Sequence, residues 1–236
     1  MKHSTTQKVI DLRNSSITKN RDRMYNKFDE HQQNFFHSIQ SNVFSFCEAA
    51  AGSGKPTVAA AALLDMLVNG NIDKIVYVRV ADDRAQSIGY YPGSLEEKTD
   101  IYWTPFCQAL ESLGLTKADI DELKLAGQIE TTLDINLRGC NINRAGVILD
   151  EVQNADFYTL KLIFTRLSDN CHIAVIGDGN QCDNKNATND YLDYCNHLAE
   201  SCMGNKCKLV SNFRGHFSKI AESYKKVRND SIGDTK

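Results

Sequence analysis

The first residues that suggest a chemistry form a small glycine-containing loop followed by a lysine. Residues 48–57 read Glu-Ala-Ala-Ala-Gly-Ser-Gly-Lys-Pro-Thr, between a short β-prone run and an alanine- and leucine-rich segment. Glycines let backbone N–H groups converge on phosphate oxygens, and the start of a helix adds positive potential. Lys55 would then reach the β- and γ-phosphates. The loop predicts a phosphate-binding site, and the alternative is an ordinary glycine turn before a helix.

Two positions of this loop depart from the usual phosphate-binding pattern, in which Gly, four variable residues and Gly-Lys precede Ser or Thr. Ala49 replaces the first glycine, and Pro56 occupies the Ser/Thr position. Proline has neither a hydroxyl for Mg²⁺ nor an N–H for a phosphate, and it biases Lys55 away from helical geometry. Thr57 would substitute if the start of the helix shifts. We therefore expect the loop fold to persist more readily than its magnesium site.

A second candidate is an apolar run, 147–149, that ends in Asp150 and Glu151. In a phosphate-loop protein the first carboxylate holds Mg²⁺ through water, and the second polarises the attacking water. The alternative is a pair of acids at the start of a helix. Because a phosphate loop lies upstream, we favour the catalytic interpretation.

Two more polar groups follow apolar runs later in the chain. Gly177-Asp178 makes a turn after residues 173–176, and Gln181 is placed to bind the γ-phosphate or its water. Arg214 follows residues 209–213, and an arginine at the γ-phosphate neutralises charge in the transition state. The alternatives are a plain turn and a surface arginine.

Strand-like and helix-like segments alternate along the chain, which predicts an α/β fold with a parallel sheet covered on both faces. The expected strands are 43–47, 74–80, 129–133, 145–149, 172–176 and 207–210. The expected helices are 30–40, the segment from the loop to 68, 94–114, 116–126, 157–167, 188–203 and 217–227, with a loop at 82–93.

Length and composition are those of one globular domain. The chain has 236 residues and 42% hydrophobic content. No apolar run is long enough to cross a membrane, and the first residues lack the apolar stretch of a secretion signal. We therefore expect a cytoplasmic protein without membrane contact.

The net charge of −3 is unevenly distributed. Residues 1–27 carry seven basic and two acidic side chains, and residues 219–236 carry five and three, so the middle is strongly acidic. Basic ends suit phosphate contacts, although a solvated, frayed terminus would have the same composition.

The eight cysteines form no C-x-x-C pair, which favours free thiols. A zinc site is the alternative, because five candidate ligands lie close together in the sequence. They are Cys182, Cys195, His197, Cys202 and Cys207.

The loop, the Asp-Glu pair, the Gly-Asp-x-x-Gln turn and the late arginine, in this order, resemble the PhoH-like family of P-loop ATPases, which is related to superfamily 1 helicase cores. The resemblance covers roughly residues 29–227. It includes the family-specific stretches Gly89–Lys98 and Asp150-Glu-Val-Gln-Asn154.

This resemblance implies a RecA-like core with ATP and Mg²⁺ at the site. It also implies an adenine-reading Gln32, with Gln33 as a rival, and an Arg79 that faces nucleic acid. The implied divisions are a basic extension at 1–27, the ATPase domain at 28–228 and a tail at 229–236. The implied catalytic residues are Lys55, Glu151, Gln181 and Arg214; the metal ligands are Asp150 and Thr57; the nucleotide-binding residues are Gln32, Ala51, Gly52, Ser53, Gly54, Lys55, Pro56 and Thr57.

The leading functional hypothesis is an ATPase coupled to RNA or single-stranded nucleic acid. By resemblance it would assemble as a hexameric ring, and chains of this length are common in bacteriophages, which would place this one in the host cytoplasm. The alternative, suggested by Pro56, is a weakly active nucleotide-binding ring component; a small-molecule kinase fits the motifs less well. Four aromatic residues would either stack on bases or pack inside the protein: Tyr90, Tyr91, Tyr102 and Trp103.

Overall fold

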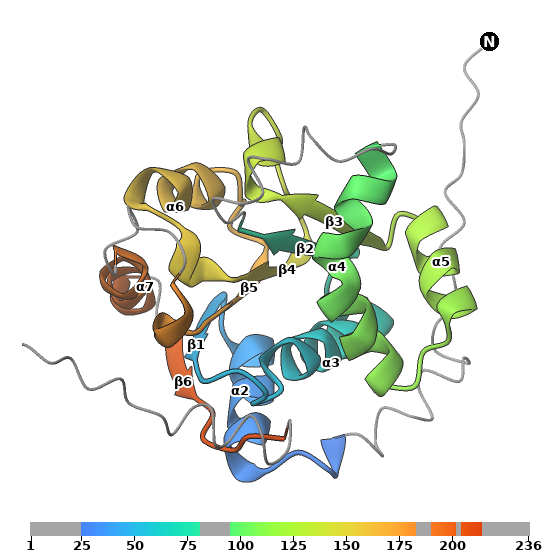
Figure 1. Cartoon of the computed structure of the whole chain (residues 1–236), viewed down its shortest axis with the longest axis horizontal. Coiled ribbons are helices and arrows are strands. Elements are labelled where there is room, and N and C mark those ends of the chain that lie inside the picture. The colour runs from blue at the N-terminus through green and yellow to red at the C-terminus, as the bar shows by residue number, and fades with distance from the viewer. Residues whose placement is uncertain (1–24, 81–94, 183–189, 202–203, 214–236) are drawn as a thin grey trace, which may run out of the picture.

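The computed structural model describes residues 25–80, 95–182, 190–201 and 204–213. Within these residues, six strands form one sheet in the order β3-β2-β4-β5-β1-β6, and every pair is parallel (Figure 1). The strands are β1 (Phe44–Glu48), β2 (Lys74–Arg79), β3 (Ile129–Leu133), β4 (Ala145–Asp150), β5 (His172–Gly177) and β6 (Asn205–Lys208).

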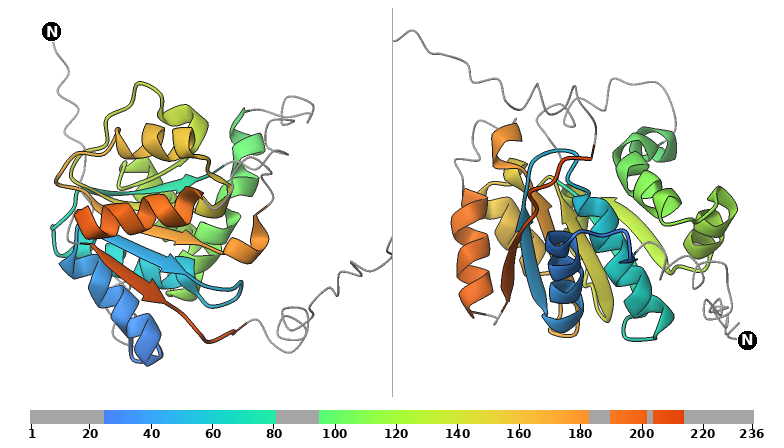
Figure 2. Two further views of the ribbon diagram at one scale, coloured as in Figure 1. Left: turned by 90° about the vertical axis from the view of Figure 1, so that its left-hand side faces the viewer. Right: turned by 90° about the horizontal axis from the view of Figure 1, so that it is seen from below.

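Helices cover both faces of the sheet (Figure 2). The helices on one face are α2 (Glu30–Ser41), α3 (Lys55–Val68), α4 (Leu95–Ser112) and α5 (Lys117–Leu125), and those on the other are α6 (Phe157–Phe164) and α7 (Asp190–Ser201). Connections that run from β1 toward β3 use the first face, and those that return toward β6 use the second, as right-handed crossovers require. The α/β fold with a parallel, RecA-like sheet is therefore confirmed.

Side chains in the central strands alternate between two hydrophobic cores. Ile75 and Tyr77 of β2 join the core under α2–α5, while Val76 and Val78 join the core under α6 and α7. Strands buried on both faces explain why these segments are almost continuously apolar in the sequence.

Local signals set the starts of several helices. Asp29 and Gln32 form a capping box at the start of α2, and Thr116 and Asp119 form another at α5. Asp156 caps α6 through the N–H of Thr159, 2.8 Å away. Three short 3₁₀ segments were not expected: η3 (Asp134–Leu137), η4 (Val152–Asn154) and η5 (Gly179–Gln181).

The clearest differences from the predicted boundaries are at α6 and β6. Helix α6 ends at Phe164 rather than 167. The residues after it pair with Ile142 instead, because the N–H of Ile142 donates to the carbonyl oxygen of Arg166 at 2.8 Å and Leu167 forms a β-bridge with Ile142. Strand β6 covers 205–208 rather than 207–210, because its partner β1 ends at Glu48, opposite Lys208. The expected loop at 82–93, the helix at 217–227 and Tyr90 and Tyr91 lie outside the described residues.

The zinc hypothesis does not fit the positions of its candidate ligands. Cys195 belongs to the core under α6 and α7, whereas Cys207 belongs to the core on the opposite face. Burial raises the pKa of the Cys195 thiol to about 12. Among the described residues no cysteine forms a disulfide, and Cys202 lies outside them.

Trp103 is 8% exposed, and the Lys124 ammonium lies 3.1 Å from the centre of its ring. Its surroundings match the packing hypothesis rather than base stacking. Among the described residues, no helix is both long and apolar enough to span a bilayer.

Candidate functional site

The glycine loop turns sharply from the end of β1 into α3. Gly52 and Gly54 have φ values of 80° and 82°, a left-handed conformation that glycine adopts without steric cost. Gly54 is the N-cap of α3, and its carbonyl accepts the N–H of Val58 at 3.0 Å. The loop therefore presents the N-terminus of a fourteen-residue helix at the carboxyl edge of the sheet.

Lys55 is buried, and its ammonium donates to carbonyl oxygens of its own loop. One is Ala50 O, at 3.0 Å from Nζ, and the other is Ala49 O. Burial lowers the pKa of Lys55, and the negative charges of Asp178, Asp150 and Glu151 partly offset that effect. The negative charges of both predicted acids therefore favour the charged form of Lys55.

Two segments outside the loop hold it in place. Gln32 is buried, and its Nε2 donates to Ser53 O at 3.1 Å, whereas Gln33 bonds to Phe28 O at the start of its own helix. Of the two glutamines, Gln32 is therefore the one that contacts the loop. The N–H of Phe213 donates to Gly52 O at 2.8 Å, so the segment after β6 also runs against the loop.

The acids lie at the end of β4, two strands away from β1. Asp150 is buried; its Oδ2 accepts the Tyr77 hydroxyl at 2.5 Å, and its Oδ1 accepts the N–H of Glu151 at 2.9 Å. Burial and the neighbouring Glu151 charge raise the pKa of Asp150, while the Tyr77 hydrogen bond and Arg79 oppose the rise.

Glu151 has φ +58°, a left-handed conformation that is uncommon for a non-glycine residue. Because the chain turns here, the carboxylate of Glu151 lies beyond the end of β4. Its Oε1 lies 3.3 Å from Nη2 of Arg79, and its Oε2 accepts Nε2 of Gln153 at 2.6 Å.

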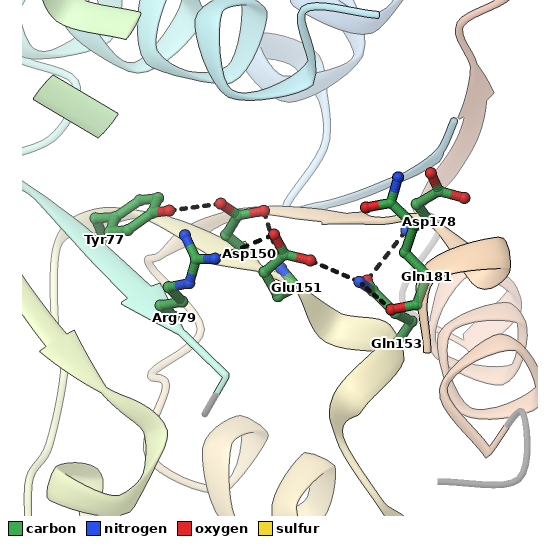
Figure 3. Close-up of polar contacts among 7 residues, drawn as sticks. All are labelled: Tyr77, Arg79, Asp150, Glu151, Gln153, Asp178 and Gln181. Carbon is green, nitrogen blue, oxygen red and sulfur yellow. Dashed lines mark hydrogen bonds and ion pairs between the residues drawn. The ribbon is translucent and has the colours of Figure 1, made fainter. Parts of the chain in front are cut away.

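A chain of hydrogen bonds links these acids to the loop, and Figure 3 shows its part from the acids to Asp178. The amide of Gln153 donates to Glu151, and its Oε1 accepts the N–H of Asp178 at 3.1 Å. The carboxylate of Asp178 accepts the N–H of Ala51 in the loop at 3.0 Å. Strand β5 lies between β1 and β4, so its end bridges the two halves of the site.

A sequence profile of the PhoH-like protein family matches residues 26–212. The match includes the loop, both acids and the turn that bridges them. The chain belongs to the PhoH-like family. This family is of the P-loop ATPase type, and nucleotide binding accords with the geometry of the loop.

The relatives of this PhoH-like chain are moderately similar to it. A PhoH-like protein of Synechocystis sp. is 29% identical over 206 residues, which cover 85% of this chain and 62% of that protein. A PhoH-like protein of Bacillus subtilis is 34% identical over 152 residues (64% and 47%), and protein PhoH of Escherichia coli K12 is 31% identical over 156 residues (66% and 44%). The chain thus spans about half of the length of these relatives.

Pro56 occupies the second position of α3 in this PhoH-like chain. Helix α3 begins at Lys55. Thr57 therefore lies one residue further along the helix, a rotation of about 100° from position 56. The expected role of Thr57 as a metal ligand stays a prediction, in which its hydroxyl serves the cation from the third position of α3.

The residues present fit a nucleotide and a hard cation. Ser53 in the loop is 2% exposed, and among the described residues no partner binds its hydroxyl. An unsatisfied buried hydroxyl in a loop that leads into a helix N-terminus suits a phosphate oxygen. The carboxylates of Asp150 and Glu151 are the oxygen ligands that Mg²⁺ prefers.

The sequence prediction missed three polar residues at this site. Tyr77 was treated only as part of an apolar strand, Gln153 only as part of a family stretch, and Asp178 only as a turn residue. A tyrosine inside an otherwise aliphatic run was the available signal. Gln181 is exposed, and its carbonyl lies 3.5 Å from Nε2 of Gln153. Arg214 lies outside the described residues.

Proposed function

We propose that this protein binds ATP with Mg²⁺ and hydrolyses it. The proposal depends on one observation: the buried lysine of the glycine loop and the Asp150-Glu151 pair lie at the same edge of one parallel sheet, joined through Gln153 and Asp178 by hydrogen bonds. Ligands of open parallel sheets bind at this edge.

Each residue would take one role in phosphoryl transfer. Lys55 would leave the carbonyls of its loop and bind the β- and γ-phosphates, and Asp150 would hold Mg²⁺. Glu151 would orient and deprotonate the attacking water, with Gln181 and Arg214 beside the γ-phosphate. Bound Mg²⁺ would supply charge neutralisation between the phosphates.

Steady-state ATP turnover with and without RNA or single-stranded DNA tests this function. We expect magnesium-dependent release of phosphate that is lost in Lys55→Ala. If wild-type protein binds no nucleotide in the presence of Mg²⁺, the proposal is wrong.

We further propose that turnover is coupled to RNA or single-stranded nucleic acid and that the chain works in a homo-oligomeric ring, in which a neighbour's Arg214 completes the site. The support is the family resemblance together with Arg79, which lies one hydrogen bond from Glu151. A nucleic-acid phosphate that attracted Arg79 would compete with that bond. Affinity should fall with added salt, as phosphate contacts require.

A second candidate function is nucleotide binding with slow hydrolysis. It is favoured by Pro56, which removes one N–H and one hydroxyl from the position that normally serves the phosphate and the metal. ATP would then act mainly to stabilise an assembly. A turnover rate that nucleic acid fails to raise, combined with tight ATP binding, would favour this function.

A further inference from the structure

Tyr77 stands out among the residues of the central strands. It lies opposite Ile148 in the pairing of β2 with β4, so Asp150 is two positions further along the neighbouring strand, on the same face. The tyrosine ring spans this diagonal, and its hydroxyl reaches Oδ2 of Asp150 (Figure 3). The contact therefore follows from the strand register.

Packing fixes the direction of the Tyr77 ring. Its face stacks on Phe106 of α4, with ring centres 4.8 Å apart and planes inclined by only 8°. Tyr77 is 1% exposed, and Phe106 is fully buried. Because a buried, stacked ring has little rotamer freedom, its hydroxyl is held at one position relative to Asp150.

The consequence concerns the metal site. Pro56 supplies no hydroxyl to a cation, so cation binding depends more on the carboxylates at the end of β4, of which Asp150 is the buried one. A single carboxylate binds a cation well only if its orientation is fixed before the cation arrives. The Tyr77 hydroxyl and the N–H of Glu151 each donate a hydrogen bond to one carboxylate oxygen of Asp150, and the remaining lone pairs of these oxygens can still bind a cation.

We propose that Tyr77 is a positioning residue for the magnesium-binding carboxylate of Asp150. This inference rests on the proposed nucleotide–magnesium function. Tyr77 acts through Asp150 and touches neither nucleotide nor metal.

The test is Tyr77→Phe in the full chain, which removes the hydroxyl and keeps the stacked ring. The probe is a fluorescent ADP analogue, titrated at a series of Mg²⁺ concentrations and in EDTA. We expect the Mg²⁺ concentration at half-maximal enhancement of binding to rise by roughly tenfold, within the range for loss of a partner that orients a metal ligand. Binding in EDTA should match that of wild type.

Tyr191→Phe is a matched control. Tyr191 is another tyrosine that is 1% exposed, and its hydroxyl donates to the carboxylate of Glu48 at 3.3 Å, outside the proposed metal site. This variant should leave the Mg²⁺ midpoint unchanged. If Tyr77→Phe lowers the melting temperature as Tyr191→Phe does but does not move the midpoint, the hydroxyl is only a structural partner and the inference is wrong. If wild type itself binds no nucleotide with Mg²⁺, the proposed function fails, and the inference fails with it.

Discussion

The two halves of the site are built differently. At the end of β4, the acids are held by side chains of neighbouring elements: Tyr77 on Asp150, and Arg79 and Gln153 on Glu151. In the phosphate loop, the Lys55 ammonium is held by carbonyls of the loop itself.

This difference indicates which half must change when a ligand binds. The acids keep their orientation because their partners belong to packed strands and helices. Under the proposed function, Lys55 would exchange carbonyl partners for phosphate oxygens, and the N–H of Ala51 would exchange the carboxylate of Asp178 for a phosphate. The carboxylates at the end of β4 are therefore preorganised, and the loop is the half of the site that rearranges.

The largest expected effect is on turnover and comes from a substitution in the carboxylate half of the site, at the end of β4. Glu151→Gln removes the base but keeps the shape, so turnover should fall by about 10²- to 10⁴-fold while ATP affinity stays near that of wild type. Stopped-flow or steady-state phosphate release measures the rate. Glu130→Gln is the control, because Glu130 pairs with Lys74 on the exterior of the same sheet, 2.7 Å away. A loss of only a few-fold would remove Glu151 from the base role.

The next largest effect is on nucleotide affinity and comes from a substitution in the loop. Lys55→Met removes charge-assisted bonds to phosphate worth about 1.5–3 kcal/mol each, so nucleotide affinity should fall by at least about tenfold. Isothermal calorimetry measures the affinity. Because the folded protein no longer buries an ammonium, denaturant unfolding of the unliganded variant should show no loss of stability. A strongly destabilised variant would mean that the loop carbonyls are structural partners rather than exchangeable ones.

Substitutions of two glycines separate the effect of backbone strain from that of steric crowding beside the loop. Gly54→Ala and Gly139→Ala both place a side chain at a positive φ, 82° and 81°, and should each cost about 1–2 kcal/mol of unfolding free energy. At Gly54 the new Cβ would also lie 2.8 Å from Nε2 of Gln32, whereas Gly139 has nothing within 4 Å. Denaturant unfolding should therefore show the larger loss for Gly54→Ala. Equal losses would show that Gln32 adapts freely and does not brace the loop.

The smallest expected effect is a gain in turnover from a substitution that restores the usual residue type in the loop. Pro56→Thr restores an N–H and a hydroxyl at the second position of α3, and a neutral hydrogen bond contributes about 0.5–1.5 kcal/mol. Turnover should rise by roughly three- to tenfold, and less Mg²⁺ should be needed for half-maximal rate. Unchanged turnover and Mg²⁺ dependence would show that the proline does not limit this site.

Local patterns predicted most of the elements because buried parallel strands are visible as apolar runs. The capping residues Asp29 and Thr116 also mark helix starts in the sequence. The ends of α6 and β6 were misplaced because they are set by partners distant in the chain: Ile142 for α6 and the end of β1 for β6. Pairing across the sheet has no local signature.

The sequence by itself determined that a glycine loop with a lysine and a pair of carboxylates each follow an apolar strand, because residue types and their spacing carry that information. Only the tertiary structure decided what holds them. The contacts of Tyr77 with Asp150, and of Asp178 with the loop, join residues 73 and 127 positions apart. Such contacts depend on strand order, register and ring packing, which arise only when the whole sheet assembles.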